Sequence, residues 1–330
     1  MSRILFAILL LTLMGNPVWA AESVEEAGTL TITAHYVTTP PTSMNDPLWK
    51  DIPSAKVPVA GRLELANIQE FVFTKALFTN DEIFFLISWD DPTQSTEKQS
   101  WQFDGEQWSH KSGDEDRLAL LFEIGRIHQF SSKSCVVVCH SPADLPRDQW
   151  KLATRTLPEK GDLWHWKAAR SAPYGYADDG WLTVAGNPSG SYRETGRRND
   201  AGEGGDVRNE EAGGIRPMYM HAASRSAEEH GVLLLEDAVQ ITDFSAFKAG
   251  TVIPYRLPVP PKGSRFDVKA ESKHADNRWT LMLHRVLHTG HDDDVSFNTL
   301  KRYSFAMAVF DNTGADHSKA TRSLTLEFKR

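Results

Sequence analysis

The only two cysteines of the chain fall in one short window with a histidine, Cys135-Val-Val-Val-Cys139-His140. Two thiols can add across the vinyl groups of a haem, and a histidine directly after the second thiol can bind the iron. The usual spacing is C-x-x-C-H, and this C-x3-C-H window has one extra residue. The window therefore predicts one covalent haem c on Cys135 and Cys139, with His140 as the proximal iron ligand.

Three other uses of these cysteines compete with haem attachment. In an oxidising compartment, Cys135 and Cys139 could form a disulfide that closes a small loop. A zinc site would need a fourth ligand beyond two thiols and one histidine. Nucleophilic chemistry is disfavoured because three valines supply nothing that lowers a thiol pKa. A disulfide has no use for His140, which favours the haem.

The first 20 residues have the pattern of a cleaved secretory signal peptide. Arg3 supplies the positive charge, residues 4–13 form an apolar stretch too short to cross a bilayer, and Val18-Trp19-Ala20 fits a cleavage site. No later stretch approaches the roughly 20 apolar residues of a membrane helix. We expect a periplasmic mature chain with no transmembrane segment. Its formal charge of -8 argues against a nucleic-acid surface.

Short alternating or β-branched and aromatic runs, bounded by turn residues, predict strands through most of the chain. Amphipathic helices are scarce, and strands do not alternate with helices, which favours an all-β antiparallel β-sandwich over a doubly wound fold. We expect one domain over residues 21–330, with a long irregular excursion at about 173–230. The expected strands are residues 29–37, 71–78, 82–89, 117–124, 278–284, 303–310 and 323–328.

The order and spacing of several segments resemble the haem-binding domain of the ethylbenzene dehydrogenase haem subunit and its relatives, a group allied to type II dimethylsulfoxide-reductase-like molybdoenzymes. The resemblance implies a carbohydrate-binding-module-like or immunoglobulin-like sandwich with long loops around one haem. The segments are Asp46-Pro47-Leu48-Trp49, residues 82–92 (EIFFLISWDDP), residues 116–124 (DRLALLFEI), residues 162–170 (DLWHWKAAR), residues 175–179 (GYADD) and residues 267–312.

The family also implies a ligand scheme. Its members with a non-covalent b haem have a methionine before the Trp-x-Trp-Lys-Ala segment and a lysine near the C-terminus as axial ligands. Here the pair Cys139-His140 occupies the methionine position, which suggests a c haem with histidine in place of methionine.

The second axial ligand stays open among four residues. The family's lysine position falls within residues 313–319, where His317 is our first choice because neutral imidazole binds haem iron strongly. Lys319 would keep the family's amine. His165 points away from its two tryptophan neighbours if residues 162–167 form a strand, and Met220 follows these.

Other residues have both a haem-related and an ordinary interpretation. Trp164 and Trp166 could form walls of the haem pocket or belong to the core. Lys167 and Arg170 could pair with haem propionates or form surface salt bridges. The acidic run at residues 291–294 is typical of a solvated turn, and no metal site is predicted there.

Taken together, these features predict a periplasmic mono-haem c-type cytochrome that transfers single electrons and is not itself an enzyme. It would act freely or as the haem subunit of a larger oxidoreductase, with a molybdoenzyme or a membrane electron-transport component as partner. One alternative is a haem-free, sugar- or ligand-binding sandwich with a Cys135–Cys139 disulfide. Another is a haem peroxidase with a vacant sixth position.

Overall fold

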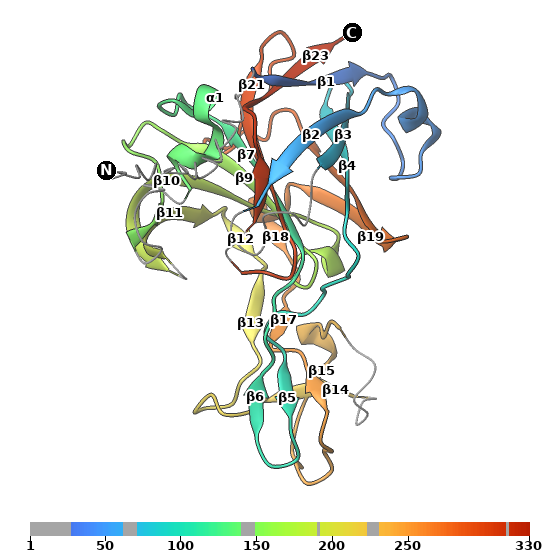
Figure 1. The fold of residues 1–330 in the computed structure, drawn as a ribbon, viewed down its shortest axis with the longest axis vertical. Coiled ribbons are helices and arrows are strands. Elements are labelled where there is room, and N and C mark those ends of the chain that lie inside the picture. Colours follow the sequence, from blue (N-terminus) through green and yellow to red (C-terminus); the bar gives the residue numbers. More distant parts are fainter. Residues whose placement is uncertain (1–27, 62–70, 140–148, 190–191, 223–230, 315–316) are drawn as a thin grey trace, which may run out of the picture.

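The main element of the described part of the chain is one large, mainly antiparallel sheet of 14 strands (Figure 1). The structure is a computed structural model that describes residues 28–61, 71–139, 149–189, 192–222, 231–314 and 317–330; the expected signal peptide, residues 1–20, lies outside these ranges. The strands of this sheet are β1 (Leu30–Tyr36), β2 (Ala55–Ala60), β3 (Phe71–Phe78), β4 (Glu82–Asp90), β7 (Arg117–Glu123), β8 (Lys151–Leu152), β9 (Gly161–Lys167), β10 (Asp178–Ser189), β11 (Tyr192–Asn199), β19 (Lys269–Ala275), β20 (Arg278–Val286), β21 (Tyr303–Phe310), β22 (Ser318–Ala320) and β23 (Leu324–Lys329).

The sheet curls over itself and so forms the predicted β-sandwich. Its main path runs β19-β20-β4-β3-β1-β23-β21-β7-β9-β10-β11-β8, and β2 and β22 pair beside it. Five strands separate β4 from β9 along this path, yet Phe85 of β4 contacts Trp164 of β9, with 6.0 Å between ring centroids. Trp89 and Trp166 meet in the same way at 6.1 Å. The all-β prediction is confirmed.

Apolar residues on alternate positions of these strands fill the space between the two layers. Trp89, Trp164 and Trp166 are fully buried there, in one continuous core with residues of β1, β3, β7, β20, β21 and β23. An aromatic side chain of about 200 Å² contributes on the order of 5 kcal/mol when it is buried at about 25 cal/mol per Å². The aromatic residues that interrupt the aliphatic runs are therefore a main source of the core's stability.

The segment 173–230, which the sequence predicts to be irregular, is partly regular. Strands β10 and β11 belong to the main sheet, and β10 pairs antiparallel with β9 over five residues. Hydropathy does not reveal these strands because their buried positions include Asp178 and Asp179. Each carboxylate forms a salt bridge with an arginine there, Asp178 with Arg265 and Asp179 with Arg285. These acidic residues are therefore buried, although the sequence pattern alone would predict that they are exposed to solvent.

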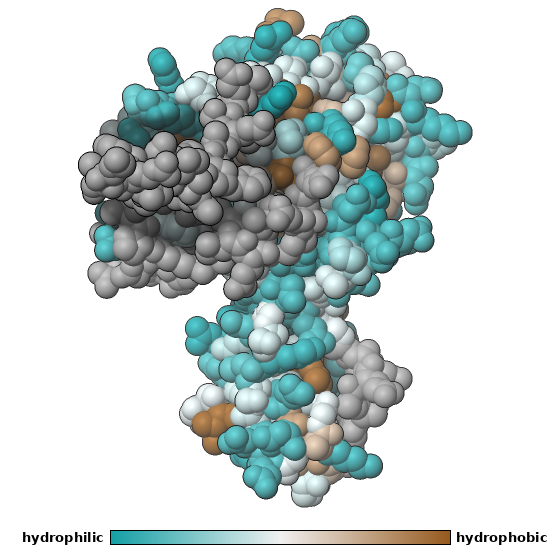
Figure 2. Space-filling view, in the orientation of Figure 1, coloured by the Kyte–Doolittle hydropathy of each residue, from teal (hydrophilic) through white to brown (hydrophobic). Residues whose placement is uncertain are grey.

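A small lobe, which the single-domain prediction did not include, extends from one end of the sandwich (Figures 1 and 2). It has its own apolar cluster around Trp101, Phe247 and Tyr255. Its strands and those that lead to it are β5 (Trp101–Phe103), β6 (Trp108–His110), β12 (Gly202–Glu203), β13 (Asp206–Arg208), β14 (Tyr219–His221), β15 (Ala238–Gln240), β16 (Val252–Ile253), β17 (Arg256–Pro258) and β18 (Lys262–Gly263).

Helices are few and short in the described ranges. None of them is long and apolar enough to cross a membrane. They are η1 (Pro47–Asp51), α1 (Phe130–Lys133), η3 (Ser134–Val137), η5 (Ala172–Tyr174), η6 (Leu235–Asp237) and η7 (Ser264–Phe266).

Candidate functional site

The two cysteines lie on one helical turn against the outer face of the sheet. Cys135 belongs to η3, and the backbone N–H of Cys139 donates to the carbonyl oxygen of Cys135 at 2.7 Å. Residues four apart on a helical turn point to the same side, so the extra valine of C-x3-C-H suits a helical turn. Both cysteines are free thiols; Cys135 is buried and Cys139 partly buried.

The two thiols are close enough to affect each other's ionisation. A hydrogen bond from the Cys139 thiol lowers the pKa of Cys135, and the charge of Lys319 lowers it further. The same hydrogen bond and burial raise the pKa of Cys139 well above its usual value. Cys135 is therefore the more easily ionised of the pair, and the amine of Lys319 lies near it.

The thiols open onto a cleft between their turn and the sheet. The cleft encloses a cavity of roughly 120 Å³ and is open to solvent at its mouth. Its lining is mainly apolar with a few basic and imidazole groups: Arg117, Ala119, Leu121, Cys135, Cys139, Leu152, Leu163, His165, Leu182, Arg197, Ala306, Met307, Ala308, Phe310, Gly314 and His317.

Strand register explains why there is space at this place. Ala308 on β21 is opposite Ala119 on β7, and Ala119 is opposite His165 on β9. Residues opposite one another on neighbouring strands point to the same face of a sheet. Two alanines thus stand beside His165 in one row, and their small side chains leave room over the imidazole.

His165 is a residue of this cleft whose side-chain polar atoms are buried without hydrogen bonds from the described residues. Its side chain is buried, and neither Nδ1 nor Nε2 has a hydrogen-bond partner among the residues that the structure describes. Burial lowers its pKa well below the usual value, and the nearby charges of Arg197 and Lys167 act in the same direction. The imidazole is therefore neutral, with a ring nitrogen able to donate a lone pair to a metal.

The other predicted iron ligands differ in their position. His317 lines the cleft, and its ring centroid lies 4.7 Å from that of Phe310. Lys319, on β22, is paired with Ala308 of β21, so its side chain is on the same face of the sheet as the cleft. Met220 packs in the small lobe and does not line the cleft. His140 lies outside the described residues.

The two tryptophans predicted as pocket walls belong to the core. Trp164 and Trp166 are fully buried between the layers of the sandwich, on the face of β9 opposite His165. Neither lines the cleft. Of the two interpretations drawn from the sequence, the structure supports the core position.

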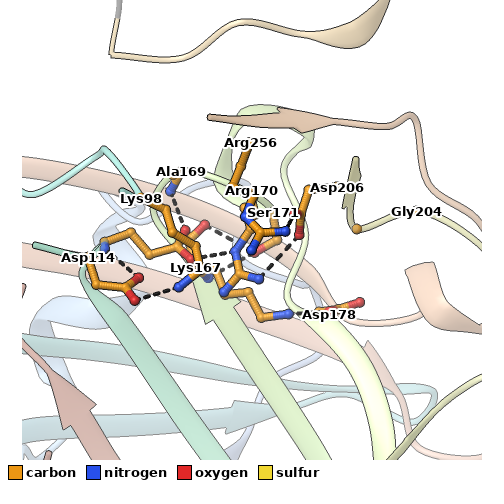
Figure 3. Close-up of polar contacts among 12 residues, drawn as sticks. Lys98, Asp114, Lys167, Ala169, Arg170, Ser171, Asp178, Gly204, Asp206 and Arg256 are labelled. Carbon is orange, nitrogen blue, oxygen red and sulfur yellow. Dashed lines mark hydrogen bonds and ion pairs between the residues drawn. The ribbon is translucent and has the colours of Figure 1, made fainter. Parts of the chain in front are cut away.

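Lys167 and Arg170, predicted as partners of propionates, already have carboxylate partners (Figure 3). Lys167 forms a buried salt bridge with Asp178, whereas Arg170 pairs with Glu115 at 2.5 Å and with Asp206 at 3.2 Å. Burial alone would raise the pKa of Asp178, but the charge of Lys167 and the hydrogen bond from Arg265 outweigh it and hold that pKa well below the usual value.

Arg197 is the functional candidate that sequence reasoning missed. It lines both the cleft and a neighbouring polar cavity that includes Lys167, Arg170 and Arg265. Its guanidinium makes no hydrogen bond or salt bridge with any residue that the structure describes. The only sequence signal was an arginine pair, residues 197–198, in a stretch that seemed irregular.

Comparison with known proteins adds to this geometry. The family model described as "Ethylbenzene dehydrogenase" matches residues 46–322. The chain belongs to the ethylbenzene dehydrogenase family. No curated protein matches it. Similar solved structures include a family 9 carbohydrate-binding module of Caldicellulosiruptor kristjanssonii with glucose, 7% identical with a TM-score of 0.38, covering 91% of this chain and 95% of that one. A second similar structure is described as a putative carbohydrate-binding protein from Bacteroides uniformis. It is 6% identical with a TM-score of 0.36, and the match covers 92% of this chain and 100% of that one.

The cleft of this ethylbenzene dehydrogenase family member contains the donor types that a c-type haem requires. Two adjacent free thiols can form thioether bonds, the unpaired nitrogens of His165 can bind iron, and the apolar lining can exclude water. Arg197 adds positive charge suited to the propionates of a haem, whereas Arg117 already pairs with Asp114 and Glu115. The residues present therefore fit the group that the cysteine window predicts.

Proposed function

We propose that this protein is an exported, periplasmic electron-transfer cytochrome with one haem c bound in the cleft. The observation that carries the proposal is the convergence of Cys135, Cys139 and the unpaired His165 on one apolar cavity. A disulfide-closed binding module gives no reason for a buried imidazole without a partner beside its thiols, because such a group costs roughly 1–3 kcal/mol. Family membership agrees with a module that works with an oxidoreductase.

Each residue of the cleft has a distinct part in this proposal. Cys135 and Cys139 hold the group covalently, and His140 follows directly in sequence as the proximal ligand. Among the described residues we place His165 ahead of His317 as the second axial ligand, because both of its ring nitrogens are buried without a partner. Arg197 supplies the charge that faces the propionates, in place of Lys167 and Arg170, whose charges are already neutralised.

The haem would supply reversible one-electron oxidation and reduction, and the chain would tune it. Leu121, Leu163 and Leu182 exclude water from the cleft, and burial of this kind together with the choice of axial ligands sets a haem's potential. Two histidine ligands leave no open position, which fits electron transfer and not peroxide chemistry. The partner would be another redox protein, such as a molybdoenzyme or a membrane electron-transport component.

Attachment is tested by expressing the full chain together with haem-attachment machinery. The denatured protein is expected to give a pyridine haemochrome spectrum, and Cys135→Ala combined with Cys139→Ala is expected to abolish covalent haem. Val136→Ala is the matched control, since it lies between the two cysteines and offers no thiol. A colourless wild-type protein would overturn the proposal.

Axial ligation is tested by ferric absorption and electron paramagnetic resonance spectra. His165→Ala is expected to convert a low-spin spectrum to a high-spin one while haem stays attached, whereas His317→Ala leaves it low-spin. The reverse result would restore His317 as the ligand. Rapid cyanide binding by the wild-type protein would contradict two protein ligands and favour a peroxidase.

A further inference from the structure

A second cluster of charged residues lies outside the cleft, around the fully buried Arg285 of β20. Its guanidinium donates to Asp162 at 2.8 Å, to Asp294 at 2.9 Å and to Asp179 at 3.1 Å. It also donates to the carbonyl oxygen of Val295 at 3.0 Å. One cation thus faces three carboxylates that are almost completely removed from water.

A fourth buried carboxylate makes this imbalance larger. Asp200, which directly follows β11, is 4% exposed, and within the described ranges neither of its side-chain oxygens has a hydrogen-bond partner. One oxygen each of Asp200, Asp293 and Asp294 lie within 4.8 Å of one another. Asp294 Oδ2 also accepts no hydrogen bond from the described part of the chain.

The cationic groups near this trio do not neutralise it. Arg285 is already engaged by three carboxylates. The imidazole of His291 lies 3.5 Å from both Asp294 and Asp267, so it is shared between Asp294 and one further acid. A buried carboxylate without hydrogen bonds or a counter-charge is strongly unfavourable, and buried charges are normally paired or coordinate a metal.

We propose that Asp200, Asp293 and Asp294 bind a calcium ion. Carboxylate oxygens are the ligands that Ca²⁺ prefers, and its flexible coordination accepts backbone carbonyls and water as the remaining ligands. Asp293 is only half-buried, so the ion can enter from solvent. The burial of Asp294 departs from the expectation that the run 291–294 is a solvated turn. The residue that would complete the site, Asp200, follows β11 and is distant from this run in sequence.

The ion would join two parts of the chain that are distant in sequence. Asp200 ends the β10–β11 hairpin, and Asp293 and Asp294 lie in the loop between β20 and β21. The hairpin pairs with β9, and β21 pairs with β7, so both flank the strands that form the floor of the cleft. Bound calcium is therefore expected to raise the thermal stability of the whole sandwich, with or without haem.

The test uses the full chain after treatment with EDTA and exchange into metal-free buffer. Titration calorimetry with CaCl2 is expected to show saturable binding of a single ion, and calcium is expected to raise the melting temperature. Asp200→Asn keeps the size of the side chain but removes its charge, and we expect it to weaken calcium binding at least about tenfold. Asp293→Asn gives the same test at a half-buried position that folding tolerates more easily.

Asp292→Asn is the matched control, because Asp292 is in the same loop but its exposed side chain pairs with Lys160 at 3.1 Å. It is expected to leave calcium binding within about twofold of wild type. No binding heat and no thermal shift at millimolar calcium would overturn the proposal. So would an equal loss of affinity in Asp292→Asn, since that would indicate general attraction to an acidic surface.

Discussion

Replacement of His165 by leucine is expected to stabilise the haem-free protein while it removes a ligand from the haem-bearing one. In the haem-free chain, the two buried ring nitrogens of His165 have no hydrogen-bond partner in the ranges that the structure describes, and an unsatisfied buried polar group costs roughly 1–3 kcal/mol. Leucine has a similar size and no polar atoms, and the neighbouring Ala119 and Ala308 leave space for its branched end. The net charge of the cleft does not change, because the imidazole is neutral.

The expected gain can be measured by urea unfolding. A gain of about 2 kcal/mol and an m-value of about 3 kcal/mol per molar correspond to an increase of about 0.7 M in the urea midpoint. Haem-free protein for this assay comes from expression without attachment machinery, and tryptophan fluorescence reports unfolding. His317→Leu is the control; His317 is only partly buried and has an interaction partner, so no gain is expected. A lower midpoint for His165→Leu would refute the reasoning, because it would mean that the imidazole is satisfied in the haem-free fold.

Three further changes test other parts of the structure. Ala119→Phe is expected to fill the cleft and reduce haem incorporation, measured as the Soret-to-protein absorbance ratio, because Ala119 lines it beside His165. Arg285→Met leaves three buried carboxylates without their cation and is expected to lower the free energy of unfolding by about 3–5 kcal/mol in urea titrations. Burial and the nearby Asp91 raise the pKa of Asp116 from 3.8 to about 7. The folded chain thus holds this proton more tightly than the unfolded chain. The free energy of unfolding is therefore expected to fall as the pH rises from 4 to 7 in calorimetric melts, and Asp116→Asn is expected to reduce this pH dependence.

Each of these has a result that would contradict it. Unchanged haem content in Ala119→Phe would indicate that the haem binds elsewhere. The control is Ala60→Phe, at an exposed position on β2, which is expected to leave the haem content unchanged. A loss below about 1 kcal/mol in Arg285→Met would mean that the aspartates are protonated or bound to another cation. Stability that rises from pH 4 to pH 7, with the same slope in Asp116→Asn, would exclude Asp116 as the titrating group.

Sequence reasoning predicted the sandwich because its strands follow simple hydrophobic alternation. The runs 71–78 and 303–310 coincide with β3 and β21. It failed for β10 and its partner β11; buried positions of β10 carry Asp178 and Asp179. Their burial depends on arginines 87 and 106 residues away, and a local pattern contains no information about partners at that distance.

The candidate site was predictable only in part, for the same reason. Cys135 and Cys139 are adjacent in sequence, so their shared chemistry is visible from spacing. The position of His165 beside two alanines, and the lack of a hydrogen-bond partner for its ring nitrogens among the described residues, depend on the register of β21, β7 and β9. Arg197 reaches the same cleft only because β11 belongs to the sheet. Side chains brought together by strand pairing become recognisable only once the register is known.

The position of β23 has a consequence for how the protein is made. This last strand pairs in parallel with β1 and antiparallel with β21, in the interior of the main sheet. The sandwich therefore cannot close until β23 is available to pair with β1 and β21, and such contacts between residues distant in sequence slow folding. The cysteine turn precedes β23 in the chain by almost 190 residues. We therefore expect its thiols to be accessible to modifying enzymes for as long as the sheet is incomplete.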